Sequence, residues 1–189
     1  MSLKILFLGY SRFETKIVDE LLLNNHKVFC TEDKVDCEFI SNFDWIVSFG
    51  YRYILKADQL QAINYQAINL HTSYLPFNKG SHPNFWSFIE DTKKGVSIHQ
   101  IGEGLDTGDI YVQKELEIDE ESSTFKSSYQ LLIAEIEDLF LAEYQNIFNG
   151  VIKPVKQKGK GTYHRVKDLP KVDNWDINIK KYKDEYKNG

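Results

Sequence analysis

Short apolar runs alternate with helical patterns along most of the chain. Brief runs of apolar and β-branched residues that stop at polar residues or glycine predict buried strands. These runs span residues 3–9, 26–30, 44–50, 66–70, 96–101 and 109–118. Helical spacing of apolar side chains is found in residues 13–24, 57–63, 83–91 and 125–148, and Phe13 falls on the apolar face of the first of these. Strands alternating with helices predict an α/β fold, a mostly parallel sheet flanked by helices.

The composition changes after Pro154. The stretch that follows is basic, contains glycines and lacks long apolar runs, so we expect a short irregular C-terminal appendage over residues 151–189. Its last part, residues 178–189, is highly charged and predicts a frayed helix or tail. We therefore expect one principal domain over residues 1–150, since a chain of 189 residues has room for one full-sized core.

Composition and charge narrow the functional classes. Apolar residues make up 42% of the chain and aromatic residues 14%, which predicts a folded globule. The net charge of -5 argues against broad nucleic-acid binding, because that binding needs Lys and Arg side chains to neutralise phosphates. The sequence shows no long apolar run and no leader, so we expect a cytoplasmic protein without a membrane partner. Cys30 and Cys37 have no metal-ligand cluster near them, and we expect two reduced thiols and no metal site.

The segment 68–86 places two polar side chains at the carboxyl end of a predicted strand. Asn69 and His71 are two residues apart and therefore lie on the same side of that strand. An amide that donates to a developing oxyanion and an imidazole that titrates near neutral pH suit acyl transfer. A structural Asn and His at a strand end are about as common, so spacing alone leaves both interpretations open.

A glycine-rich acidic loop is predicted at residues 102–110. Its three glycines allow the backbone to approach a ligand closely, and Asp106 lies in the middle of the loop. A solvated acidic turn would have the same composition, so the loop alone does not decide between a site and a turn. The oxygen-bearing residues do not follow the alternating spacing of an EF-hand, which disfavours a calcium loop.

Two motifs together resemble the folate-dependent formyltransferase family. They are INLHTSYLPFNKG at residues 68–80 and GVSIHQIGEGLDTGDI at residues 95–110. The resemblance extends over roughly residues 3–150 and implies a Rossmann-like formyltransferase fold, in which residues 1–150 are the catalytic domain. It also implies 10-formyltetrahydrofolate as cosubstrate and no metal. The catalytic residues of that family map onto Asn69, His71 and Asp106.

The resemblance implies a mechanism in which a substrate amine attacks the formyl carbon. The Asn69 amide and a protonated His71 would donate hydrogen bonds to the oxyanion, while Asp106 would hold His71 and stabilise its charge. By the same resemblance, folate would contact the end of the strand predicted at 44–50 and the acidic loop. The residues implied are Phe49, Gly50, Tyr51, Ile54, Glu103, Gly104 and Leu105.

The chain is most similar to the sugar-nucleotide N-formyltransferases, of the dTDP-4-amino-4,6-dideoxyglucose formyltransferase type. The segments FGYRYIL, PFNKGSHPNFW and GTYHRVKDLP look like that branch. The similarity implies that the acceptor is an amino dideoxy sugar linked to a nucleotide. The formylated sugar would be used for surface polysaccharide, the O-antigen of lipopolysaccharide. The similarity also allows a homodimer. Its candidate contacts with the sugar nucleotide are Asn78, Lys79, Tyr163 and His164, with Lys79 where that branch often has Arg.

Three alternatives remain at this stage. A methionyl-tRNA formyltransferase has nearly the same catalytic motifs, but it normally has a further β-barrel domain, and the acidic balance of this chain disfavours tRNA. A glycinamide ribonucleotide formyltransferase has a glycine-rich phosphate loop after the first strand, where this chain has GYSRFE. A non-catalytic folate or nucleotide-sugar binding module on the same scaffold is the third, since a fold does not establish an activity.

Overall fold

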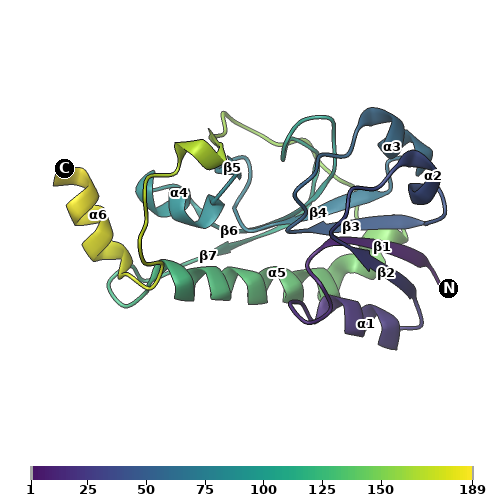
Figure 1. Cartoon of the computed structure of the whole chain (residues 1–189), viewed down its shortest axis with the longest axis horizontal. Helices are drawn as coiled ribbons and strands as arrows, with labels where there is room; N and C mark the ends of the chain where they lie inside the picture. Colours follow the sequence, from purple (N-terminus) through teal and green to yellow (C-terminus); the bar gives the residue numbers. More distant parts are fainter. Residues whose placement is uncertain (1, 189) are drawn as a thin grey trace.

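The computed structural model describes residues 2–188 and contains one six-stranded sheet with helices on both faces (Figure 1). In spatial order the strands are β2 (Lys27–Thr31), β1 (Lys4–Gly9), β3 (Trp45–Phe49), β4 (Ala67–His71), β6 (Lys94–Gln100) and β7 (Ile110–Leu116). The first four strands are parallel, and β6 and β7 are added in antiparallel pairs. The prediction of an α/β fold with a mostly parallel sheet is confirmed.

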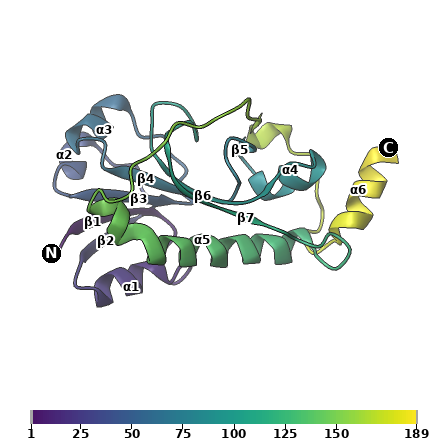
Figure 2. The same ribbon diagram turned by 180° about the vertical axis from the view of Figure 1, so that it is seen from behind.

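Each face of the sheet packs against its own pair of helices. In β1, Ile5 and Phe7 belong to the core on the side of α1 (Ile17–Leu23) and α5 (Phe125–Phe148). Leu6 and Leu8 alternate with them and face the opposite core, beneath α2 (Cys37–Ile40) and α3 (Ala57–Ala62). Figure 2 shows α5 running along the length of the sheet on the α1 side. All four of these β1 side chains are fully buried, as expected for a parallel strand covered on both faces.

The first helix is shorter than its apolar pattern predicts. It begins at Ile17, and Phe13 is 94% exposed instead of facing the core. Residues 11–14 form a turn before this helix. The Glu14 carboxylate accepts hydrogen bonds from the backbone N–H and the hydroxyl of Ser11. This local side-chain bonding competes with helix formation, and the prediction for Phe13 was wrong for that reason.

The chain after residue 150 packs back onto the domain. It contains β8 (Tyr163–His164), which pairs with β5 (Lys79–Gly80), a short 3-10 turn η1 (Val166–Asp168), and α6 (Ile179–Asn188). Ile179 is fully buried and shares a core with Phe85 of α4 (Pro83–Ile89) and Phe125 of α5. The final stretch is therefore an ordered, packed helix and not a frayed tail, since its apolar face is covered by α4 and α5. None of the helices within residues 2–188 has the length and apolar character needed to cross a membrane.

Candidate active site

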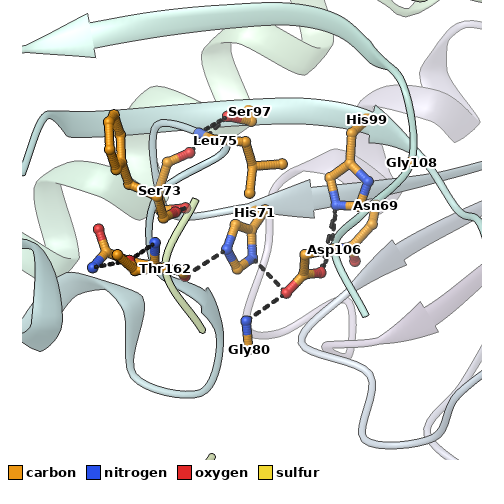
Figure 3. A network of polar contacts seen from close by, with 12 residues as sticks. Asn69, His71, Ser73, Leu75, Gly80, Ser97, His99, Asp106, Gly108 and Thr162 are labelled. Carbon is orange, nitrogen blue, oxygen red and sulfur yellow. Dashed lines mark hydrogen bonds and ion pairs between the residues drawn. The ribbon is translucent and has the colours of Figure 1, made fainter. Parts of the chain in front are cut away.

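Polar side chains gather where β4 and β6 lie side by side. Asn69 and His71 point to the same face of β4, and their register partners on β6 are His99 and Ser97. His71 is 7% exposed and His99 is 2% exposed, so these groups lie inside the protein and not on its surface. Figure 3 shows Asp106 reaching between the two imidazoles.

The loop between β6 and β7 holds Asp106 in a fixed position. The residue adopts a left-handed backbone (φ 52°), and its Oδ2 accepts a 2.8 Å hydrogen bond from the backbone N–H of Gly80. Two residues on, Gly108 must be a glycine, because a Cβ there would lie 1.7 Å from the carbonyl oxygen of Gln100. The side chain of Gln157 donates to the backbone oxygens of both Asp106 and Gly108, at 2.8 and 2.9 Å.

The structure brings the three predicted catalytic residues together. Nδ1 of His71 lies 3.8 Å from Oδ2 of Asp106, and Nδ2 of Asn69 lies 3.4 Å from Oδ1 of the same carboxylate. On its other side, Nε2 of His71 is 3.2 Å from the backbone oxygen of Asn78. A carbonyl oxygen only accepts, so a neutral His71 has its proton on Nε2 and a lone pair on Nδ1, facing Asp106.

Burial and charge act in opposite directions on His71. Burial lowers the pKa of His71 below its usual value, and the negative charge of Asp106 partly offsets this. Burial alone would raise the pKa of Asp106, but its interactions with the imidazoles of His71 and His99 and with the Gly80 N–H together hold that pKa well below the usual range. At neutral pH the site therefore contains a carboxylate and a neutral imidazole. The protonated His71 expected as a donor to the oxyanion would therefore form only when the imidazole takes up a proton during the reaction.

His99 is a site residue that the sequence interpretation missed. Its Nδ1 donates to the backbone oxygen of Gln100 at 2.8 Å, so its Nε2 can accept from the Asn69 amide at 3.2 Å. Because His99 and Asp106 both accept from it, the NH2 group of the Asn69 amide, and not its oxygen, faces these two residues. A signal was present in the sequence: Ser97 and His99 are polar residues at alternate positions of a buried strand.

One cavity opens directly onto Asn69 and Asp106. It has a volume of about 90 Å³, and its walls also include Ser48 and His99. Four of the seven residues expected to contact folate line it, namely Tyr51, Ile54, Gly104 and Leu105. Apolar walls with a few polar groups at one end are typical of a small-molecule site.

The other three expected folate residues do not line this cavity. The side chain of Phe49 is 2% exposed and belongs to the core on the α5 side of the sheet, because side chains alternate along β3. Gly50 lies against the ring of Tyr10, and Glu103 is exposed to solvent.

The four residues expected to contact the sugar nucleotide fall into two pairs. Lys79 and Tyr163 line a groove that starts at Leu105, next to the cavity described above. Asn78 is fully buried, and its amide bonds to Glu90, Thr92 and Thr162. His164 stacks on the Trp86 ring, with centroids 4.0 Å apart, and its Nε2 lies 3.0 Å from the Glu90 carboxylate. Asn78 and His164 therefore hold β5 and β8 in position, while Lys79 and Tyr163 are open to a ligand.

Within residues 2–188, the structure contains no group of three or more His, Cys, Asp or Glu side chains that could bind a metal ion.

A family model described as formyl transferase matches residues 32–142, which is more than half of the chain. The chain belongs to the formyl transferase family. Among solved structures, it is similar to the formyltransferase PseJ from Anoxybacillus kamchatkensis, with 42% identity and a TM-score of 0.87. The match covers 94% of this chain and 96% of PseJ, whose structure contains UDP-4,6-dideoxy-4-formamido-L-AltNAc and tetrahydrofolate.

The chain is also similar to two curated methionyl-tRNA formyltransferases. The protein from Clostridium botulinum is 35% identical over 71% of this chain, and that from Fusobacterium nucleatum is 37% identical over 74%. The chain spans less than half of their length, 44% and 46%. The predicted family and formyltransferase fold are confirmed, and both the predicted branch and its nearest alternative are found among the relatives.

Proposed function

We propose that the protein transfers a formyl group from 10-formyltetrahydrofolate to the amine of an amino dideoxy sugar linked to a nucleotide. The observation that supports this most is the assembled trio of Asn69, His71 and Asp106 at the end of a cavity with apolar walls. The likeness to PseJ supports the acceptor class, because that match extends over nearly the whole of both chains.

The cavity beside Asn69 has the chemistry that a pterin requires. Its walls are formed by Ile54, Leu55, Ile101 and Leu105, while Asn69 and Asp106 stand at one end. Ile54 and Leu105 are 63% and 41% exposed, so they lie at the rim, where a planar ring would enter. The cavity is smaller than the roughly 300–1,000 Å³ of common ligand sites, and we expect the rim to open when folate binds.

The residues of the trio divide the work of acyl transfer. Folate supplies the formyl group on N10, and the product is a formamide on the acceptor. Neutral His71 takes the proton that the acceptor amine loses, at Nδ1, and returns it to the leaving nitrogen. The imidazolium formed in between is stabilised by two acceptors, the Asn78 carbonyl and the Asp106 carboxylate.

Asn69 is the donor for the oxygen that becomes negative during the transfer. Its amide hydrogen bonds, at 3.2 and 3.4 Å, are long enough to be exchanged for a shorter bond to an oxyanion. Such a donor typically accounts for about 100-fold to 1,000-fold in rate.

We further propose that this reaction takes place in the cytoplasm and that the formylated sugar serves surface polysaccharide such as the O-antigen of lipopolysaccharide. Lys79 and Tyr163 remain predicted contacts of the sugar nucleotide, and assembly as a homodimer remains a prediction.

The test is formyl transfer from 10-formyltetrahydrofolate to a panel of UDP-linked and dTDP-linked 3-amino and 4-amino sugars, followed by mass spectrometry. Methionylated initiator tRNA is included as the alternative acceptor, and His71→Asn is the control for chemistry by this site. Formylation of a sugar nucleotide that disappears in the variant supports the proposal. Formylation of tRNA alone would move the protein to the other branch, and transfer to none of the acceptors would favour a binding module.

A further inference from the structure

A second cavity lies beyond the carboxyl end of β4, where α4 and the start of α5 meet. Its volume is about 410 Å³, large enough for a sizeable ligand. Thr72, which directly follows His71 in the chain, is one of its lining residues. The cavity therefore begins at the carboxyl end of β4, one residue beyond His71 in the chain.

The walls of this cavity are aromatic. Phe85 and Phe125 are each 1% exposed, and each meets the ring of Trp175 edge-on, at 89° and 90°. The rings of His82 and Trp175 are nearly parallel, with an angle of 10° and centroids 5.7 Å apart. Trp175 is nonetheless 37% exposed, so part of its ring is accessible to a ligand. Flat rings held in fixed orientations are suited to stacking on a planar partner.

His82 supports this assignment through its backbone. It adopts a left-handed conformation (φ 53°) directly before Pro83, and a residue other than glycine pays a steric cost there. Burial lowers the pKa of His82, so its ring is neutral at neutral pH and presents an uncharged face.

A cation lies at the edge of the aromatic walls. Lys126 lines the same cavity, and its ammonium is 3.9 Å from the carboxylate of Asp176 in an exposed pair. An exposed pair at this distance is weak, so the ammonium can turn to a phosphate at little cost. An aromatic wall for a base and a cation for a phosphate match the two parts of a nucleotide.

The C-terminal segment holds Trp175 in place. Its backbone oxygen accepts a 2.9 Å hydrogen bond from the N–H of Lys126. Farther along, Lys183 is 6% exposed and bonds to both Asp91 and Glu120, which fixes α6 against the domain. These contacts hold the Trp175 ring in the wall of the cavity, although Trp175 is far along the chain from the catalytic motifs.

We propose that the cavity formed by His82, Phe85, Phe125 and Trp175 binds the base of the acceptor nucleotide, which stacks on Trp175 while Lys126 faces the diphosphate. This inference rests on the proposed function and names the place where the acceptor is held. It assigns to residues after 150 a role in choosing the acceptor, while the formyl transfer itself is carried out by β4 and the Asp106 loop.

The experiment measures the binding of UDP and of dTDP, which lack the sugar, by calorimetry and by tryptophan fluorescence. Trp45 and Trp86 are 6% and 8% exposed, so quenching by a bound base will come mainly from Trp175. We expect Trp175→Ala to weaken binding of the nucleotide by about 5-fold to 150-fold, the loss typical of one stacked base. Trp175→Phe should lose less affinity, and the quenching signal should disappear in both variants.

Tyr186→Ala is the matched control, because Tyr186 is an exposed aromatic residue (46%) of α6 outside the cavity. Tetrahydrofolate binding should be the same in all variants, and circular dichroism will show that each is folded. If the nucleotide binds Trp175→Ala and Trp175→Phe as tightly as it binds the unmodified protein, this cavity is not the base site. If tetrahydrofolate binds the unmodified protein but neither nucleotide does, the nucleotide-sugar acceptor itself is refuted.

Discussion

The charge of Asp106 should determine the rate of formyl transfer through its effect on His71. The carboxylate lies 3.8 Å from Nδ1 of His71, and both side chains are less than a tenth exposed. Two unit charges at this separation attract by about 4 kcal/mol at an effective dielectric constant of about 20. Asp106→Asn keeps the shape and removes that attraction from the imidazolium formed during the reaction. We expect kcat to fall by up to about 1,000-fold.

The pH profile separates this cause from a simple loss of structure. His71 must be neutral to accept a proton, so kcat rises as the pH increases through the pKa of His71. The Asp106 charge raises that pKa against the effect of burial. In Asp106→Asn the pKa should therefore fall further, and the acidic limb of the profile should move to lower pH.

The assay is the initial rate of formyl transfer at saturating concentrations of both substrates between pH 5 and 9, with tetrahydrofolate binding measured in parallel. Asp109→Asn, in the same loop but outside the trio, is the control and should keep its rate. A kcat within tenfold of the unmodified protein, or an acidic limb that does not move, would refute the role assigned to Asp106.

Three other substitutions test the surroundings of the trio. His99→Leu removes the acceptor that orients the Asn69 amide. We expect kcat to fall by about 5-fold to 100-fold, as for a buried donor left without a partner (about 1–3 kcal/mol), while tetrahydrofolate affinity stays unchanged. A normal kcat in this variant would contradict the orienting role of His99. Lys79→Ala should raise KM for the sugar nucleotide; a rise in KM for folate instead would assign the groove to folate. Gly108→Ala places a methyl group against the Gln100 carbonyl and should lower both Tm and activity; an unchanged melting curve would show that the loop adapts.

Much of the sheet and the shared face of Asn69 and His71 could be predicted because the signals are local. Six apolar runs predicted the six strands of the main sheet, since a buried strand needs only a short run of apolar residues. Asn69 and His71 are two residues apart on one strand, which places them on one face whatever the rest of the fold. The position of Asp106 beside them depended on the resemblance to a known family and not on spacing.

The features that the sequence did not predict depend on contacts between distant residues. His99 becomes a neighbour of Asn69 only because β6 runs antiparallel to β4, and no pattern in either strand specifies that pairing. Phe13 has a helical spacing, but the local bonding of Ser11 and Glu14 starts the helix later. The charged end of the chain looked like a tail, because its buried face consists of only a few side chains such as Ile179 and Lys183.

The bond from Gln157 to the Asp106 loop has a consequence for synthesis of the protein on the ribosome. The sheet strands and α5 are complete by residue 148, and N-terminal parts of a chain generally fold first. The loop of Asp106 gains its two bonds from Gln157 only after that residue has emerged, and Trp175 adds the wall of the second cavity later still. A nascent chain would thus have a folded core before the Asp106 loop and the second cavity have all of their supporting contacts.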